Sequence, residues 1–168
     1  MLTEAIRLTL FPGMMAFAAS SDLLTMTIAN RVSVILVGGF LVLAALTGAS
    51  AAEIAAHAGA AAAVLAAAFI CFARGWIGGG DAKLAAATAL WLGFGHLLDY
   101  LLYASILGGA LTVLIVQFRH LPLPQLLAGR DWAERLHRPD GGVPYGIALA
   151  AAALLVYPQT EWMTVLGR

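Results

Sequence analysis

The chain has 168 residues, of which 62% are hydrophobic and 11% are charged. Soluble domains carry about 25% charged residues, because their surface must face water, so this composition excludes an ordinary water-soluble fold. The formal net charge is zero and gives no indication of a nucleic-acid partner. The sequence therefore predicts an all-α integral membrane protein that forms a single membrane domain over residues 1–168.

Six apolar runs predict about six transmembrane helices. They lie at residues 4–21, 32–49, 54–73, 82–92, 97–118 and 143–157. The fourth and fifth come from one apolar stretch that, as a single helix, would be more than about 50 Å long against a hydrocarbon core of roughly 30 Å. The chain is therefore expected to turn back at Gly93-Phe94-Gly95-His96. The fourth helix is short, so its complete crossing of the bilayer is left open.

The first run also has features of a signal peptide, because it is apolar and is followed by small residues. However, Glu4 and Arg7 leave the preceding segment without net positive charge, and Pro12-Gly13 interrupts the run. We therefore expect residues 1–21 to be a retained first span.

One substantial polar segment, residues 119–142, joins the last two predicted helices. Pro122 and Pro124 are expected to end the fifth helix, and residues 139–142 to form a turn before the sixth. Between them, residues 125–136 predict a short amphipathic helix at the membrane interface. The basic residues of the segment suit contact with anionic lipid.

The distribution of Lys and Arg predicts how the protein is oriented in the membrane. The loops after the first, third and fifth predicted helices carry seven basic residues: Arg31, Arg74, Lys83, Arg119, Arg130, Arg135 and Arg138. The other side and the termini carry only Arg7 and Arg168. The first side is therefore expected to be cytoplasmic, with both termini outward.

Four acidic residues near membrane depth are the candidates for chemistry, because charge there is costly and often functional. They are Asp22, Glu53, Asp81 and Asp99. The predicted topology puts Asp22 and Asp81 at the cytoplasmic face and the other two at the opposite face. Two close carboxylates favour opposite protonation states, since two like charges do not both ionise cheaply, and such a pair can hydrolyse a peptide bond.

Three glycines precede the second of these aspartates, in the run Gly78-Gly79-Gly80-Asp81-Ala82-Lys83. They allow a tight backbone at the membrane edge and the close approach of a substrate strand. Asp81 would also cap the following helix, but capping alone does not explain the glycines. The run is not a phosphate-binding P-loop, because Asp81 stands where that motif requires Lys.

Two other functions are open from the residues alone. A small ion or solute transporter would use intramembrane polar residues as stations along a path: Asp22, Asp81, His96 and Asp99. A non-enzymatic scaffold for membrane assembly would tolerate Asn in place of Asp22 and Asp81. Of the histidines, His57 is expected to be packed or water-facing, and His96 to form a hydrogen-bonded pair with Asp99.

The segment before Asp81 resembles the GxGD motif of the type IV prepilin peptidases, which are membrane-embedded aspartic proteases. The residues that carry this likeness are Gly78, Gly80, Asp81 and Lys83. The segment around the other acid is similar to the first catalytic site of that family, here Ser21-Asp22-Leu23. Asn30 matches the end of the family's downstream Ile-Pro-Asn element, and Ala29 departs from it where Pro is common.

Pro144-Tyr145-Gly146 is similar to an element of the short tight-adherence (Flp pilus) branch, so the resemblance extends over essentially the whole chain. It implies that Asp22 and Asp81 form a catalytic dyad. The implied substrates are prepilins and pseudopilins, whose basic leader lies in the cytoplasm and whose apolar helix lies in the membrane. The implied location is the bacterial inner membrane, with cleavage at its cytoplasmic face.

Longer members of that family carry an N-terminal domain with paired Cys-x-x-Cys motifs and also methylate the new terminus. This chain has one cysteine, Cys71, and no room for such a domain before the first predicted helix. Neither methyl transfer, a metal nor another cofactor is therefore expected. The expected partners are the prepilin substrates and the lipid bilayer, with no nucleic acid, and the oligomeric state is left open.

Overall fold

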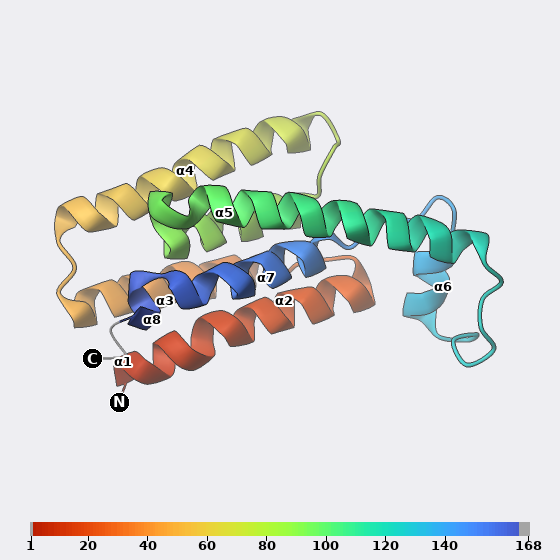
Figure 1. Cartoon of the computed structure of the whole chain (residues 1–168), viewed down its shortest axis with the longest axis horizontal. Coiled ribbons are helices and arrows are strands. Elements are labelled where there is room, and N and C mark those ends of the chain that lie inside the picture. Colours follow the sequence, from red (N-terminus) through yellow and green to blue (C-terminus); the bar gives the residue numbers. More distant parts are fainter. Residues whose placement is uncertain (1, 165–168) are drawn as a thin grey trace.

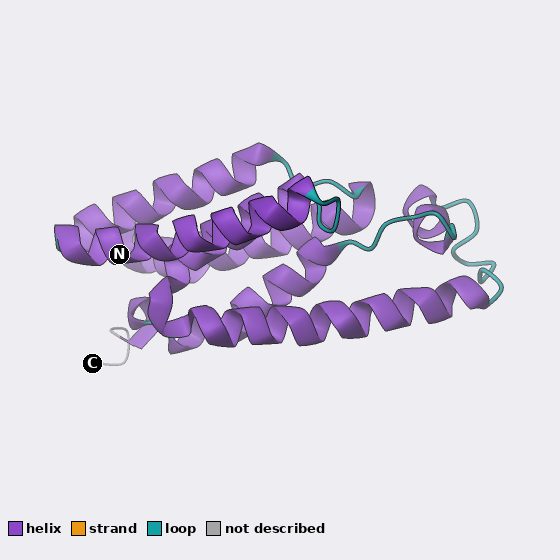
Figure 2. Ribbon diagram, turned by 90° about the horizontal axis from the view of Figure 1, so that it is seen from above, coloured by secondary structure: helices purple, strands orange, loops and turns teal. Residues whose placement is uncertain are grey.

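The computed structural model describes residues 2–164, and this part of the chain folds into helices joined by loops, without a β-strand (Figures 1 and 2). In chain order the elements are α1 Leu2–Ala5, a π-helical turn Ile6–Leu10, α2 Phe11–Thr25, α3 Asn30–Thr47, α4 Ala51–Ala73, α5 Gly79–His120, α6 Asp131–His137, α7 Tyr145–Val156, a 3-10 turn Tyr157–Gln159 and α8 Glu161–Thr164. Arg168, which entered the charge count above, lies outside the described residues.

Three of the described helices, α3, α4 and α5, are long and apolar enough to cross a membrane, and α7 with its 3-10 turn is a shorter apolar helix. Large apolar side chains point outward from them, among them Phe69, Leu98 and Leu114, which are 62%, 77% and 62% exposed. Water would not tolerate such a surface, but lipid covers it. The prediction of an all-α membrane protein is confirmed, while the number of crossings and the outward termini stay predictions.

The first helical rod is longer than predicted, since it runs without interruption from Leu2 to Thr25 through α1, the π-helical turn and α2. Pro12 does not break it, because the residue directly follows the π-helical turn Ile6–Leu10, where the backbone hydrogen-bond pattern changes at the start of α2. The rod ends at Met26, which adopts a left-handed conformation with φ 55°. Asp22 therefore lies in the last turn of a helix and not at the end of the span.

The chain turns back inside α5 at Gly93, as the length of the apolar stretch predicted. Gly93 has φ 65° and ψ −179°, a conformation outside the helical range. It divides α5 into a first arm, residues 79–92, and a second arm, residues 94–120. Ala85 of the first arm and Ala104 of the second line the same small cavity, so the two arms lie side by side. The second arm extends past the other helices toward α6 (Figure 1).

His57 of α4 packs against this reversal, which confirms that it is a packed residue. Its Nδ1 is 2.7 Å from the carbonyl oxygen of Leu90, and a carbonyl can only accept, so Nδ1 carries the hydrogen. A Cβ atom at Gly93 would lie 2.9 Å from Cε1 of the imidazole. Both the positive φ and this contact therefore require glycine at the reversal.

Gly93→Ala is expected to destabilise the fold by about 1–3 kcal/mol, because alanine is strained at this φ and its methyl group would displace His57. Thermal unfolding of the purified protein in detergent measures the loss. Gly95→Ala is the matched control, since a Cβ at Gly95 meets nothing within 4 Å. Equal melting temperatures for the two variants would contradict this account of the reversal.

The predicted interfacial helix at residues 125–136 is wrong at its start, because α6 begins only at Asp131. The preceding residues form a turn that ends at Gly129, with φ 79°. The backbone N–H of Gly129 donates to Oε1 of Glu134 at 2.8 Å, so a side chain of the first turn of the helix holds the turn that precedes it. Leu126 consequently lies in the turn and is 91% exposed.

Candidate active site

Asp22 and Asp81 lie at one end of the helix bundle. Asp22 is in the last turn of α2 and Asp81 in the first turn of α5, and both turns lie at the end opposite Leu2 and α8 (Figure 1). Glu53, in the first turn of α4, lies at the end that holds the reversal. The structure therefore brings together the two aspartates that the sequence paired.

The Asp22 side chain is 5% exposed and is held by the start of α7. The backbone N–H of Gly146 donates to its Oδ2 at 2.7 Å. A Cβ atom at Gly146 would lie 2.8 Å from that same oxygen and 2.7 Å from Cδ1 of Ile28. Only glycine leaves room here for the Asp22 carboxylate, so the Pro-Tyr-Gly segment positions this carboxylate.

Asp81 is the third residue of α5, and the N-cap is Gly78. The helix therefore begins earlier than expected, and Asp81 is not its cap. The Asp81 carboxylate instead reaches back and accepts the backbone N–H of Gly78 at 3.3 Å. This contact fixes the side chain at the helix start, where the N–H groups of the first turn favour its anion.

The loop between α2 and α3 links the surroundings of the two carboxylates. The two side chains are close enough for the charge of Asp22 to be felt at Asp81. Ile28 of this loop packs against Gly146 on one side and against Gly80 on the other. A Cβ atom added at Gly80 would lie 3.1 Å from the Cβ of Ile28 and 3.3 Å from the carbonyl oxygen of Ile28. Gly80 and Gly146 therefore let α5 and α7 approach the loop closely enough to join the two acids.

Asn30 and Lys83, which the motif analysis singled out, contact each other directly. Lys83 Nζ donates to Asn30 Oδ1 at 2.8 Å. Asn30 is the first residue of α3 and Lys83 lies two residues after Asp81, so this exposed bond joins the starts of α3 and α5. This hydrogen bond restrains the loop that contains Ile28.

Beside Asp81 is a small recess of about 110 Å³ between the two arms of α5 and α7. Its other walls are Ile77, Ala85, Ala104, Tyr145, Ala148 and Leu149. The Tyr145 hydroxyl is 3.1 Å from the Thr112 hydroxyl, which holds the aromatic ring against the second arm of α5. The Asp81 carboxylate thus faces an almost entirely apolar space.

A model of the type IV leader peptidase family matches residues 9–113, which is more than half of the chain. The chain belongs to this family. The matched range includes Asp22, Asn30, Asp81 and Lys83, while Gly146 lies beyond it. No curated protein and no solved structure gives a significant match. Membership of this family identifies the chain as a protease. Its assignment to the tight-adherence branch stays a prediction.

The polar segment of the peptidase lies at the same end of the bundle (Figure 1). Arg119 donates to the carbonyl oxygens of Leu136, Gly141 and Gly142, each at 2.8 Å. Arg135 donates to the carbonyl of Leu24 at 2.7 Å, two residues after Asp22. These two of the predicted lipid-facing cations therefore serve internal contacts that hold α6 next to α2.

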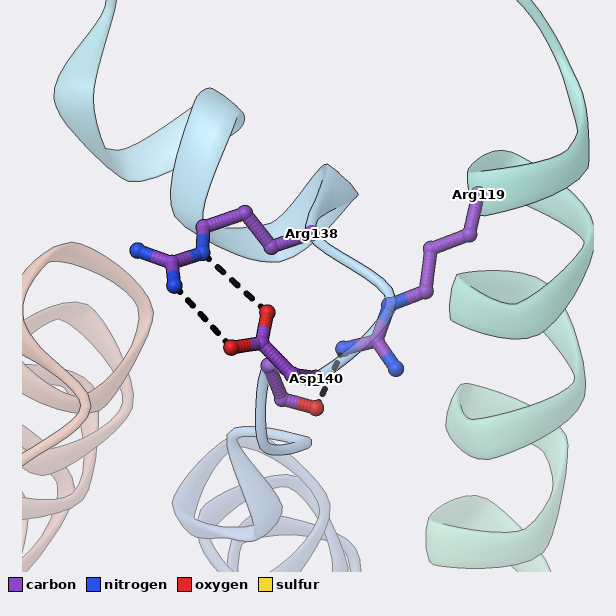
Figure 3. A network of polar contacts seen from close by, with 4 residues as sticks. Arg119, Arg138 and Asp140 are labelled. Atoms are coloured by element: carbon purple, nitrogen blue, oxygen red, sulfur yellow. Dashed lines mark hydrogen bonds and ion pairs between the residues drawn. The ribbon is translucent and has the colours of Figure 1, made fainter.

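A third cation of this segment, Arg138, forms an exposed ion pair with Asp140 at 3.0 Å (Figure 3). The hydrogen bond from Arg138 lowers the pKa of the Asp140 carboxyl. The pair closes the turn before α7, but because both side chains are exposed its contribution to stability is small.

The remaining polar candidates of the peptidase lie away from the aspartates. Glu53 caps α4 by accepting the backbone N–H of Ser50 at 2.6 Å, which gives it a structural role. Asp99 is exposed, and no hydrogen bond joins it to His96 in the described part of the chain, so the predicted pair is wrong. No cluster of three metal-binding side chains occurs among the described residues.

Sequence reasoning missed two residues of the site, Ile28 and Gly146. Ile28 was noted only as the first residue of the segment that resembles the family's Ile-Pro-Asn element. Gly146 was noted only as part of a family-like motif, and its hydrogen bond to Asp22 spans 124 positions of the chain. The signal that was available for Gly146 is its place directly after Pro144-Tyr145, at the start of a helix.

Proposed function

We propose that this peptidase is an aspartic endopeptidase that removes the leader of prepilins and pseudopilins, with Asp22 and Asp81 as its catalytic pair. The observation that carries the proposal is the convergence of these two carboxylates, from α2 and α5, at one end of an apolar bundle. The positive-inside pattern supports a position at the cytoplasmic face of the bacterial inner membrane. The Pro-Tyr-Gly segment supports a substrate of the Flp type.

The two carboxylates divide the work of hydrolysis between them. The ionised one takes a proton from a water molecule, whose oxygen attacks the scissile carbonyl carbon. The neutral one donates its proton to the carbonyl oxygen. The proton taken from water then passes to the leaving nitrogen as the C–N bond breaks, and the proton on the former carbonyl oxygen returns to the carboxylate that gave it, so that an acid and an amine result. The pair titrates as a unit, and the two roles are not assigned to individual residues.

The surroundings of the pair suit a substrate with a polar leader and an apolar helix. Gly78 and Gly79 at the start of α5 leave backbone accessible to an extended peptide. The apolar recess beside Asp81, between α5 and α7, suits the side chain of a membrane-embedded residue next to the cut. The leader itself would lie outside the bundle end, on the side of α6.

Co-expression with a Flp-type prepilin tests the proposal. The intact chain is expected to convert the precursor to a shorter product, seen as a change in its mobility and as a new N-terminus by mass spectrometry. Asp99→Asn is expected to cleave at the intact rate, because Asp99 is exposed and lies away from the pair. Proton or ion flux in liposomes that depends on Asp99, with no cleavage, would favour a transporter instead.

Lys83→Met is expected to slow cleavage only modestly, by roughly threefold to tenfold. The hydrogen bond from Lys83 to Asn30 is exposed, so its loss loosens the loop around Ile28 without removing a reacting group. Initial rates of leader removal in membranes measure this, and Asn30→Ala should behave alike. A loss as large as that of an aspartate variant would show that Lys83 takes part in the chemistry.

A further inference from the structure

A second and larger cavity, of about 590 Å³, lies at the end of the bundle that holds the α5 reversal. This is the end away from Asp22 and Asp81, so the cavity plays no part in the proposed cleavage. Its wall includes the side chains of Arg7, Phe40, Glu53, His57, His96, Glu161 and Trp162. Its volume lies in the range of roughly 300–1,000 Å³ that is common for small-ligand sites.

Arg7 is the unusual residue of this cavity. It is only 8% exposed, and its Nε is buried without a hydrogen-bond partner among the described residues. Its backbone is held in place, because the Tyr157 hydroxyl donates to the Arg7 carbonyl at 2.9 Å. A buried guanidinium N–H without an acceptor is costly, so the geometry favours an acceptor that a bound molecule supplies.

The local backbone supports a special role for Arg7. The residue lies in the π-helical turn Ile6–Leu10, and no other π-helical turn occurs in the described chain. Such turns are rare in proteins and are frequent at functional sites. This observation is independent of the unpartnered Nε and points to the same side chain.

The other charged groups on the wall limit which anion fits. Glu53 is engaged with the backbone of Ser50, and Glu161 makes a contact of its own, so neither takes the Nε hydrogen of Arg7. Their negative charge disfavours a dianion. His57 and His96 add two imidazole rings to the wall. The wall therefore suits a group with a single negative charge.

We propose that this cavity binds a phosphate-type monoanion, with Arg7 as its main donor. Guanidinium groups recognise phosphate oxygens through charge-assisted hydrogen bonds. Phe40 and Trp162, whose rings pack edge to face, provide an apolar wall beside the charge. The two sources of such a group are the phosphodiester of an anionic phospholipid, which reaches this end of the bundle from the bilayer, and free phosphate.

Binding is tested on the full chain, purified in a neutral detergent. Phosphatidylglycerol, phosphatidylcholine and inorganic phosphate are each added, and thermal unfolding and native mass spectrometry follow the bound state. At a hundredfold excess over Kd, the binding anion is expected to raise the melting temperature by about 5 °C or more. Phosphatidylcholine, which has no net charge, is expected to give no comparable shift.

Arg7→Gln is expected to weaken binding by about tenfold or more, and Arg7→Lys, which keeps the charge, by less. Arg31→Gln, at the opposite end of the bundle, is the matched control and is expected to bind like the intact chain. If Arg7→Gln does not fold, Ala56→Phe decides the matter, because it fills part of the cavity and leaves the guanidinium in place.

A shift with phosphatidylglycerol alone identifies the lipid headgroup as the ligand, and a shift with inorganic phosphate as well shows that the free anion suffices. Either result supports the site if the cavity variants lose it. No shift with either anion, or equal binding by the intact chain and the cavity variants, overturns the proposal. Leader cleavage is not used as a readout, so failure here leaves the proposed function untouched.

Discussion

Asn in place of Asp22 or of Asp81 is expected to lower the rate of leader cleavage by roughly 10³-fold or more. An amide neither takes the proton of the attacking water nor donates a carboxylic proton to the carbonyl oxygen. The fold should survive both changes, because an Asn oxygen at position 22 still accepts the N–H of Gly146, and one at position 81 still accepts that of Gly78. The loss is therefore chemical.

Initial rates of precursor cleavage, at equal amounts of membrane-inserted protein, measure this loss. The melting temperature of each variant is determined alongside and should stay close to that of the intact chain. Glu53→Gln is the matched control, since it alters an acid at the opposite end of the bundle. It should reduce the stability of the α4 cap and leave cleavage unchanged. Cleavage that survives in either aspartate variant refutes the pair.

Gly146→Ala is expected to slow cleavage by about 10²-fold, although alanine is the smallest possible change. The new methyl group would lie 2.8 Å from Oδ2 of Asp22 and 3.0 Å from its Cβ, so the carboxylate must move. A displacement of about 1 Å in a reacting group costs on the order of 10²-fold in rate. Because Ile28 fills the other side, α7 cannot shift freely to make room.

Gly142→Ala is the matched control for this variant, because a Cβ at Gly142 meets nothing within 4 Å. Cleavage rates and melting temperatures are compared for the two variants. If Gly146→Ala also unfolds the protein, Gly80→Ala replaces it, since its methyl group meets Ile28 at the milder distance of 3.1 Å. A Gly146→Ala protein that cleaves at the intact rate would contradict the conclusion that Gly146 positions the Asp22 carboxylate.

Much of the fold was predictable because the bilayer sets the length of a helix. The apolar stretch at residues 82–118 is too long for one crossing, which predicted the reversal that the structure places at Gly93. Counting the loops then put Asp22 and Asp81 at the same end. Both conclusions need only the order and length of apolar segments, which a single sequence contains.

The errors arose where local structure depends on contacts that are distant in the chain or on an unusual helical turn. Pro12 was interpreted as an interruption of the first helix, because nothing in the sequence indicates the π-helical turn before it. The start of α6 depends on the contact of Glu134 with Gly129 rather than on the apolar periodicity that predicted a longer helix. Arg7 counted only as a charge at the outer end, and its burial in the folded chain is not visible in the sequence.

The closeness of the two acids is the part of the site that no single sequence reveals. The distance between Asp22 and Asp81 depends on Ile28, Gly80 and Gly146, which come from three separate segments. A glycine in the sequence shows only that a close approach is possible. The identity of the partner that approaches becomes visible once α7 is placed against α2.

The dependence of the cleavage rate on pH is the most direct test of the claim that Asp22 and Asp81 act as a pair. The rate is measured with purified peptidase in liposomes. The account predicts a bell-shaped profile, because below the titration of the pair no carboxylate is ionised to act as base, and above it no carboxylic acid is left to donate. Both Asn variants should stay slower than the intact chain by roughly 10³-fold or more at every pH. A rate that is flat across the carboxylate range, or a variant that cleaves at close to the intact rate at any pH, would contradict it.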